Sequence, residues 1–351
     1  MAVLALDQWL PAATSFSAYW ADRARQHGFE AGTARSMDDL RSFAPVREAD
    51  VRGAGGPGCP ALLMRPTGDQ VKARASSSLL VGLAGAIRRD GADGARRAVL
   101  EEYKPIHVHR GGADDDLAIA YTRSDLDRLH RCGARAARVL GLDDADYLVN
   151  AVPSGPRVDW WGVYHLALGA SILALHPRGA GDPLERILDS FALVPATVVA
   201  VGVEEALELA ALMVEYGVEA PRVHTVVTVG PPPDDDTRRA IADAWRAAGA
   251  TESDLVVRAV YAPPESRALW AEPRQEPTGL VTFPDLELLE VVDALTGEPT
   301  DGPGDLTITT MGWHGTALVR YQTGVFVEGL DPTPCPASGL TAPRIVGEVV
   351  P

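Results

Sequence analysis

Two stretches of the chain decide its fold class: Ala196-Thr-Val-Val-Ala-Val201 and Val223-His-Thr-Val-Val-Thr-Val229. Both are short, rich in β-branched residues and almost free of charge, which is typical of strands buried on both faces of a sheet. Between them, residues 203–216 place apolar side chains at helical spacing. A strand, a helix and a second strand in this order predict a parallel βαβ unit.

The same alternation continues on both sides of this unit. Further strands are predicted at Ile106-His-Val108, Leu117-Ala-Ile119, Tyr147-Leu-Val149 and Leu255-Val-Val-Arg-Ala-Val-Tyr261. Further helices are predicted over 123–140, 160–169, 182–192 and 233–248. Thr122 with Asp125 is an acidic variant of the capping box and marks the start of the first of these helices. We therefore expect an α/β protein with a mostly parallel sheet covered by helices.

The two ends of the chain have different patterns. Residues 7–27, and a short stretch that begins at Ser36, show helical spacing. After about residue 275 the helical pattern stops, and turn residues separate short strands, which favours an antiparallel sheet or a small barrel. These strands are expected at 286–293, 305–310, 316–321 and 325–328. The expected parts are an N-terminal helical region and connector (1–103), an α/β core (104–275) and a β-rich barrel subdomain (276–351).

The composition excludes several classes of protein. The 351 residues carry 32 Lys and Arg against 48 Asp and Glu, a net charge of −16, and an acidic surface repels the phosphates of nucleic acid. No apolar run reaches the ~18 residues of a membrane span, and the first residues lack the basic stretch of a signal peptide. The three cysteines are too few for a disulfide framework, which favours a reducing compartment. The sequence therefore predicts a cytoplasmic protein that binds neither nucleic acid nor a membrane.

Five segments follow one another in a recognisable order. They are Tyr121-Thr-Arg-Ser-Asp-Leu126, Val229-Gly-Pro-Pro232, Tyr261-Ala-Pro-Pro-Glu265, Leu318-Val-Arg-Tyr-Gln-Thr-Gly324, and Pro334-Cys-Pro336 with Pro343-Arg-Ile345. In order and spacing they resemble the YTRxDL, GAEP, YGxSE, PVIRYRTRD and CPCGRxxPRI segments of phenylacetate–CoA ligase-like enzymes, members of the adenylate-forming acyl ligase superfamily. The similarity covers about residues 105–347. It implies the N-terminal domain of such a ligase, with layered sheets and helices, a distorted antiparallel β-barrel and no C-terminal lid domain.

The resemblance also implies an activity. Such a protein binds ATP with Mg²⁺ and a small aromatic or acyl carboxylate, forms an acyl-adenylate and passes the acyl group to CoA or to a carrier protein. Glu265 is then the Mg²⁺ ligand and Arg320 approaches the ribose or the phosphates. Backbone N–H groups of Gly111 and Gly112 would face the phosphates. The residues that border the adenine would be Gly230, Pro231, Pro232 and Tyr261. A homodimer is suggested only by analogy.

Other interpretations of these residues remain open. Trp161, Tyr164 and His165 lie on the helix that borders the acyl pocket in the resembled family, but aromatic residues on a helix are also typical of a plain core. Glu265 could equally be a solvated carboxylate in a loop. The run Pro231-Pro-Pro-Asp-Asp-Asp236 most simply interrupts the chain and caps the following helix.

Several departures from the family pattern favour a second function. Arg110-Gly-Gly-Ala-Asp-Asp-Asp-Leu117 stands in place of a Ser/Thr/Gly phosphate loop, and its carboxylates repel phosphate unless a divalent metal intervenes. Val325 stands where the family has the aspartate that binds ribose, and Lys104 is the last lysine of the chain. Cys335 has no second cysteine nearby, so we expect no zinc. The alternative is therefore a catalytically impaired protein that acts as a binding or regulatory partner, or one whose lid is a separate chain.

Overall fold

The computed structural model describes residues 2–30, 32–55, 60–67, 69–70, 91, 94, 97–111, 117–336 and 338–351. The chain divides into two compact units. Unit 1 comprises Met1–Arg128, Pro284–Thr300 and Asp305–Gly324, and unit 2 comprises Leu129–Phe283, Asp301–Gly304 and Val325–Pro351. The part boundaries expected near residues 103 and 275 remain predictions.

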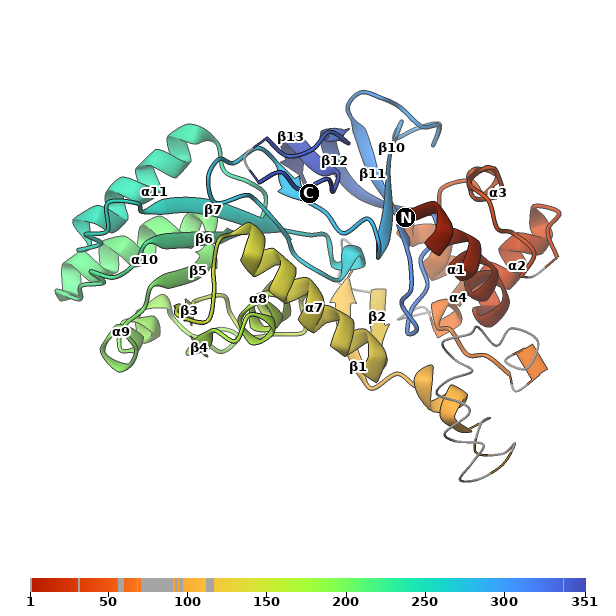
Figure 1. The fold of residues 1–351 in the computed structure, drawn as a ribbon, viewed down its shortest axis with the longest axis horizontal. Helices are drawn as coiled ribbons and strands as arrows, with labels where there is room; N and C mark the ends of the chain where they lie inside the picture. Colours follow the sequence, from red (N-terminus) through yellow and green to blue (C-terminus); the bar gives the residue numbers. More distant parts are fainter. Residues whose placement is uncertain are drawn as a thin grey trace. The chain divides into compact units, whose positions relative to one another are not determined.

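Unit 1 contains short helices and two pairs of antiparallel strands (Figure 1). Its helices include α1 (Ala2–Phe16), α2 (Ala18–Gln26), α3 (Met37–Ser42), α4 (Glu48–Gly55) and the 3₁₀ turn η1 (Pro60–Leu62). Its strand pairs are β1 (His107–Gly111) with β2 (Leu117–Tyr121), and β10 (Glu287–Val292) with β11 (Gly304–Thr310). Trp20 is fully buried and donates from Nε1 to the carbonyl of Ala317 at 2.8 Å, which joins α2 to a segment almost 300 residues later.

Unit 2 contains a mixed sheet with the strand order β4-β3-β5-β6-β7-β8-β9-β13-β12. The parallel strands are β3 (Tyr147–Asn150), β4 (Leu173–Leu175), β5 (Val198–Gly202), β6 (Thr225–Val229) and β7 (Val256–Tyr261). The antiparallel strands are β8 (Trp270–Ala271), β9 (Leu280–Val281), β12 (Tyr321–Asp331) and β13 (Arg344–Val350). The predicted parallel sheet is thus confirmed from β4 to β7, and the sheet continues beyond β7 with antiparallel strands.

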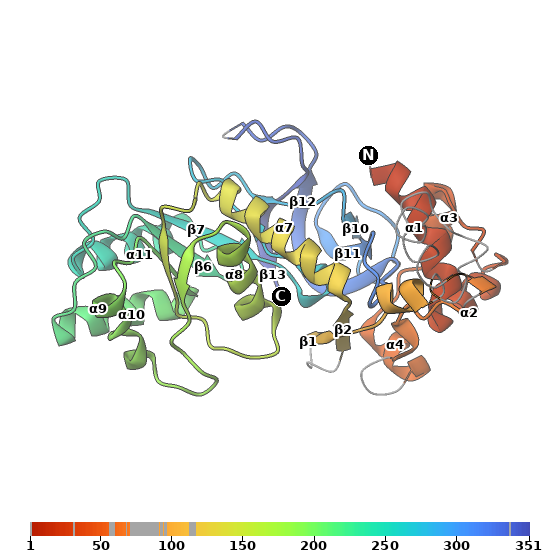
Figure 2. The ribbon, with the colours of Figure 1, turned by 60° about the horizontal axis from the view of Figure 1, so that its bottom comes forward.

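Helices pack on the parallel strands of unit 2 (Figure 2). They are α8 (Val158–Gly169), α10 (Val203–Tyr216) and α11 (Asp235–Ala247). Unit 2 also contains η2 (Leu184–Ile187), α9 (Ser190–Leu193) and the 3₁₀ turn η3 (Pro264–Ser266). Val199, Val201 and Val226 are inaccessible in the core between the sheet and these helices. Trp245 on α11 donates to the carbonyl of Ala206 on α10 at 3.1 Å, so the two helices share one buried indole.

Helix α7 (Arg123–Val139) follows the capping box predicted for it. Thr122 Oγ1 accepts from the Asp125 backbone N–H at 3.3 Å, and the Asp125 carboxylate accepts from the Thr122 N–H at 2.9 Å. In unit 2 its later turns lie very close to α8. A Cβ added to Gly133 would lie 2.0 Å from the carbonyl oxygen of His165, so only glycine permits this approach.

Three expectations about secondary structure were wrong. The helix predicted over 182–192 is broken into η2 and α9, because backbone hydrogen bonds here join residues three apart, from Arg186 N–H to the carbonyl of Pro183 and from Leu188 N–H to the carbonyl of Glu185, as in a 3₁₀ turn. No strand spans 316–321, because Arg320 has φ +45, in the left-handed region that ends an extended strand. The distorted barrel is not closed in the described residues, since β9, β12 and β13 extend the sheet of unit 2 instead.

Among the described helices, none combines the length and the apolar character needed to cross a lipid bilayer.

Candidate functional site

The carboxyl ends of the parallel strands in unit 2 meet at one edge of the sheet (Figure 1). Ligands of open α/β sheets bind at this edge. Here β3 ends at Asn150, β6 ends at Val229 and β7 ends at Tyr261. The loops after β6 and β7 carry Gly230 and Glu265, so five of the residues predicted to bind nucleotide or metal lie on two neighbouring strand ends.

A backbone hydrogen bond of Gly230 joins the end of β6 to β7. Its N–H donates to the carbonyl of Val260 at 3.0 Å, and its φ of +141 belongs to a region that other residues rarely adopt. Pro231 and Pro232 follow and are partly exposed. The run then ends as a helix cap, because the Asp234 carboxylate accepts from the Thr237 N–H at 2.7 Å at the start of α11.

Tyr261 and Glu265 are both buried, with exposed fractions of 8% and 2%. Glu265 is therefore not the solvated loop carboxylate that the sequence left open. Burial raises the pKa of the Tyr261 hydroxyl, and the negative charges of Glu265 and Asp159 raise it further. The Tyr261 hydroxyl consequently remains a hydrogen-bond donor, and two carboxylates act on the same phenol.

Helix α8 lies against the loop that carries Glu265. A Cβ added to Gly162 would lie 2.3 Å from Cγ of Leu269, so α8 approaches the 264–269 segment as closely as glycine allows. Asp159, in the first turn of α8, is one of the charges that act on Tyr261. The structure therefore brings α8 and the end of β7 together in unit 2.

The three aromatic residues predicted for the substrate pocket occupy different environments on α8. His165 is 6% exposed, and its ring centroid lies 5.3 Å from that of His130 on α7, so His165 belongs to the packing between the two helices. Trp161 and Tyr164 are partly exposed, with ring centroids 5.5 Å apart. Their assignment to a substrate pocket stays a prediction.

Sequence reasoning missed three residues at the same edge. Asn150 is the last residue of β3, His176 directly follows β4, and Trp160 stands one turn before Tyr164 on α8. The Asn150 amide nitrogen lies 3.0 Å from Nδ1 of His176. Polar residues at the ends of buried strands were the available signal, but the predicted strands stopped at Val149 and left β4 unassigned.

Arg178, which follows β4, is held in place by protein groups. Its Nη1 lies 2.7 Å from Oε1 of Glu205 and 3.3 Å from the carbonyl oxygen of Ala151, and its Nε donates to the carbonyl of Asp182 at 3.1 Å. These contacts order the loops that follow β3 and β4.

Two of the predicted site residues, Gly111 and Arg320, belong to unit 1. Arg320 is 3% exposed, and its Nε donates to Oε2 of Glu290 at 3.1 Å while Nη1 donates to the carbonyl of Phe43 at 2.6 Å. Its role near a ribose or phosphate stays a prediction. Gly111 is the last residue of β1, and Gly112 with the following aspartates lies outside the described residues.

The position of the ribose-binding aspartate is apolar in this structure. Val325 on β12 is 5% exposed. In the part of the chain that the structure describes, no group of three or more His, Cys, Asp or Glu side chains is arranged to hold a metal ion.

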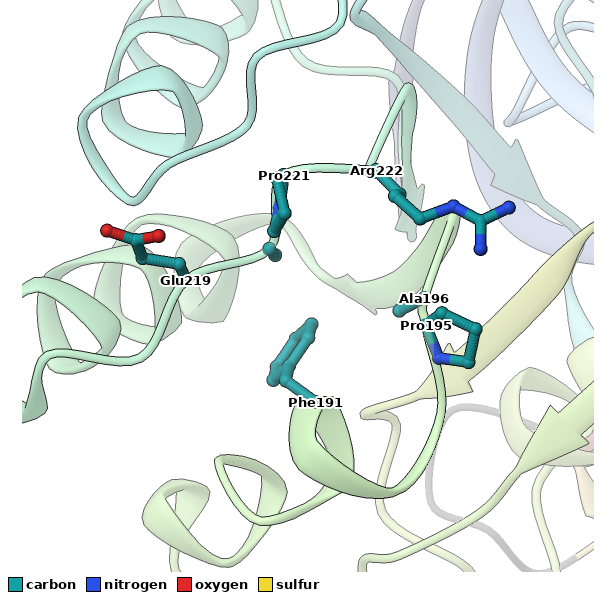
Figure 3. A pocket seen from close by; sticks show the side chains of 7 residues that line it. Phe191, Pro195, Ala196, Glu219, Pro221 and Arg222 are labelled. Atoms are coloured by element: carbon teal, nitrogen blue, oxygen red, sulfur yellow. The ribbon is translucent and has the colours of Figure 1, made fainter.

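A small cavity of about 220 Å³ lies at the opposite, amino edge of the parallel strands in unit 2 (Figure 3). Its lining residues are Phe191, Pro195, Ala196, Glu219, Ala220, Pro221 and Arg222. The Arg222 guanidinium points away from Phe191 and lies 5.7 Å from the centroid of the Tyr147 ring. None of the predicted site residues lines this cavity.

Comparison with known proteins gives matches to solved structures. No protein-family model matches the chain, and no curated protein matches its sequence. The structure resembles a 2-hydroxyisobutyryl-CoA ligase crystallised in an open conformation with 2-HIB-AMP and CoA, with a TM-score of 0.76 and 17% identity, over 99% of this chain and 68% of that chain. For the same ligase in the postadenylation state with R3-HIB-AMP, the TM-score is 0.76 at 17% identity over 99% and 66% of the two chains.

A more distant match is the adenylation domain of a keto acid-selecting NRPS module, with a TM-score of 0.51 and 10% identity over 78% of this chain and 61% of that chain. These matches show that the chain has the fold of adenylate-forming acyl ligases. The chain spans about two thirds of the length of the 2-hydroxyisobutyryl-CoA ligase chains that it matches.

Proposed function

We propose that the protein is an AMP-forming acyl-activating ligase of the phenylacetate–CoA ligase-like type, which binds ATP and a small aromatic or acyl carboxylate. The fold supports this proposal, because a ligase of the same fold was crystallised with its acyl-adenylate and CoA. One observation carries it: Gly230, Tyr261 and Glu265 lie on two adjacent strand ends, at the edge where α/β sheets bind ligands. The order of these residues is that of the nucleotide-binding segments of the resembled family.

Each of these residues has a role in the proposal. Gly230, Pro231 and Pro232 border the adenine together with the Tyr261 ring. Glu265 supplies a carboxylate oxygen to Mg²⁺, which in phosphate-binding sites is usually held by one or two carboxylates and by the substrate phosphates. Because no cluster of three ligand side chains exists among the described residues, Glu265 fits a magnesium shared with phosphates and not one held by protein alone.

The proposed reaction has two steps. A carboxylate oxygen of the acid attacks the α-phosphorus of ATP, and the bond to pyrophosphate breaks. A thiol of CoA or of a carrier protein then attacks the acyl carbonyl, and AMP leaves. Positive charge near the leaving pyrophosphate favours the first step, and arginine is the only strong cation of this chain after Lys104.

A second candidate function is a protein that binds an acyl or nucleotide ligand without turning it over, or that works only with a lid from a separate chain. Two observations favour it. Val325 is a buried apolar residue at the position that the family uses for ribose, and it cannot accept hydrogen bonds from the two hydroxyls. The Arg320 guanidinium already contacts Glu290 and the carbonyl of Phe43.

An ATP–pyrophosphate exchange assay over a panel of aromatic and short aliphatic acids tests the proposal. We expect acid-dependent exchange that falls about 100-fold in Glu265→Gln, a loss typical of a group that stabilises charge in the transition state. Glu252→Gln is the matched control, because Glu252 is exposed in a loop. Exchange that survives Glu265→Gln contradicts the role of Glu265. A thermal shift with a non-hydrolysable acyl-adenylate analogue, but no exchange with any acid, establishes the second candidate instead.

A further inference from the structure

The Asn150 side chain fixes the proton position of the His176 ring. Oδ1 of Asn150 accepts from the Val152 backbone N–H at 3.1 Å, so the amide NH₂ must point the other way. That NH₂ lies 3.0 Å from Nδ1 of His176, which therefore acts as the acceptor. A neutral imidazole that accepts at Nδ1 carries its proton on Nε2. His176 thus presents an N–H donor at Nε2.

This donor is available to a ligand. Among the residues that the structure describes, the only hydrogen bond of the His176 ring is the one from Asn150. Burial lowers the pKa of His176 below its ordinary value of 6.5, so the ring remains neutral at pH 7. Protonation of Nδ1 would also direct one N–H at the Asn150 NH₂, which opposes the charged form.

His176 lies in a group of flat rings. The ring centroids of Trp160 and Tyr164 are 5.5 Å apart with an interplanar angle of 16°, and each lies 5.4 Å from the centroid of His176. This spacing leaves no room for a ligand between the three rings, but all three residues are partly exposed. A flat molecule can therefore pack only on the solvent-facing side of the group.

The same group contains a second unsatisfied donor. Nε1 of Trp160 is buried and has no hydrogen-bond partner among the described residues. A buried donor without a partner destabilises a protein, but a molecule on the solvent-facing side of the group does not reach this atom. Nε2–H of His176 is thus the donor that a ligand of this group meets, whereas the acidic groups that act on this edge, Glu265 and Asp159, are near Tyr261.

We propose that Asn150, Trp160, Tyr164 and His176 form a specificity site, the β3–β4 edge site, for a flat apolar group that carries an uncharged hydrogen-bond acceptor. The Trp160 and Tyr164 rings contact the apolar body, His176 Nε2–H donates to the acceptor, and Asn150 is a positioning residue that keeps the proton on Nε2. This inference rests on the proposed function in one respect. If the protein activates a carboxylic acid, the site favours a planar acid that carries a ring nitrogen, a ketone or an ether oxygen away from its carboxylate. The recognition itself needs no ATP.

Two matched pairs of small molecules test the site by equilibrium binding to the full chain. Nicotinate and benzoate differ only in one ring nitrogen, and so do nicotinamide and benzamide, which have no carboxylate. We expect the pyridine member of each pair to bind about three- to tenfold more tightly, as one neutral hydrogen bond provides. The preference should disappear in His176→Phe and return in part in His176→Gln, which restores an N–H donor.

His27→Phe is the matched control, because His27 is exposed and contacts Phe43 in unit 1. This variant should keep the full preference for the pyridine member of each pair.

The ¹⁵N shifts of His176 provide a second test that does not depend on a ligand. They should show the neutral form with the proton on Nε2 at pH 7, and Asn150→Asp should raise the pKa of His176, since a carboxylate favours the imidazolium.

The outcomes separate this inference from the proposed function. A pyridine preference that is equal in the wild type and in His176→Phe, or a proton found on Nδ1, overturns the inference. Pyrophosphate exchange with acids but without any pyridine preference also overturns it and leaves the proposed function standing. A preference that depends on His176, in a protein that shows no exchange, supports the site and removes the adenylation proposal.

Discussion

Arg238 and Glu272 form a bidentate ion pair inside unit 2. Nη1 and Nη2 of Arg238 lie 2.8 and 2.7 Å from Oε2 and Oε1 of Glu272, and the side chains are 12% and 2% exposed. Glu272 also accepts from the Ala259 backbone N–H at 2.7 Å. The pair therefore joins α11 to β7 next to the strand end that carries Tyr261.

Glu272→Gln should lower the free energy of unfolding by about 3–5 kcal/mol, because it leaves the Arg238 charge buried without a counter-charge. Urea unfolding followed by circular dichroism measures this change. Asp236→Asn, which removes the exposed ion pair with Arg239, is the control and should change stability by less than about 0.5 kcal/mol. If both variants lose the same stability, the buried pair has no special role.

Gly133→Ala should destabilise unit 2, although alanine favours a helix over glycine by about 1 kcal/mol. The added Cβ would lie 2.0 Å from the carbonyl oxygen of His165, and backbone of α8 cannot move aside as a flexible side chain can. We expect a net loss of about 1–3 kcal/mol, typical of an overpacked interior. Thermal unfolding measures it, with Gly155→Ala as the control because no atom lies within 4 Å of its added Cβ. A stabilised Gly133→Ala variant would show that α7 and α8 do not pack this closely.

Asp146 should make stability depend on pH in the acid range. Burial acts to raise the pKa of Asp146, but hydrogen bonds from His224 at 2.9 Å and Thr197 at 2.7 Å outweigh it, so the pKa lies below 3.8. A carboxyl with a lowered folded-state pKa stabilises the fold above pH 3.8, and this contribution is lost as the pH falls through the folded value.

The variant Asp146→Asn should therefore be less stable than the wild type by about 1–3 kcal/mol at pH 7, and the difference should shrink below about pH 4. Urea midpoints at pH 7, 5 and 3.5 measure both effects. A difference that stays constant over this range would mean that the charge of Asp146 contributes nothing.

Val325→Asp should strengthen nucleotide binding if the proposed function holds. A carboxylate at this position can accept hydrogen bonds from two ribose hydroxyls, worth about 1.5–3 kcal/mol, or roughly 10- to 150-fold in the dissociation constant of AMP. Calorimetric titration with AMP measures the gain. Val325→Thr has nearly the shape of valine and serves as the control. Equal AMP affinity in all three proteins would mean that β12 does not face a ribose.

Local sequence signals predicted most of the α/β elements of unit 2. The Thr122 and Asp125 cap set the start of α7, and alternation of β-branched runs with helical spacing located β5, α10, β6, α11 and β7. These signals work because a buried strand and an amphipathic helix each leave their own period in the sequence. The same reasoning placed Gly230 and Glu265 after strands and Tyr261 at the end of one, where the structure has them.

Other features depend on contacts between distant residues. The strand expected at 316–321 does not form, because Arg320 has a left-handed backbone and its side chain contacts Glu290 and the 41–43 segment. The short β4 was missed because Leu173–Leu175 is too brief to show a period. Asn150 and His176 are 26 residues apart and lie at the ends of β3 and β4. No local sequence pattern predicts their contact.

The sequence by itself therefore determined the parallel α/β layer, the caps that begin α7 and α11 and the strand ends that carry the candidate nucleotide site, since these follow from local propensity and burial. Only the tertiary structure decided how distant residues meet. It shows that β9, β12 and β13 extend a sheet instead of closing a barrel, and that Glu265 is buried. It also shows that Asn150 orients His176 beside the rings of Trp160 and Tyr164. Contacts of this kind depend on how separate elements pack, and packing geometry is not encoded in any single stretch of residues.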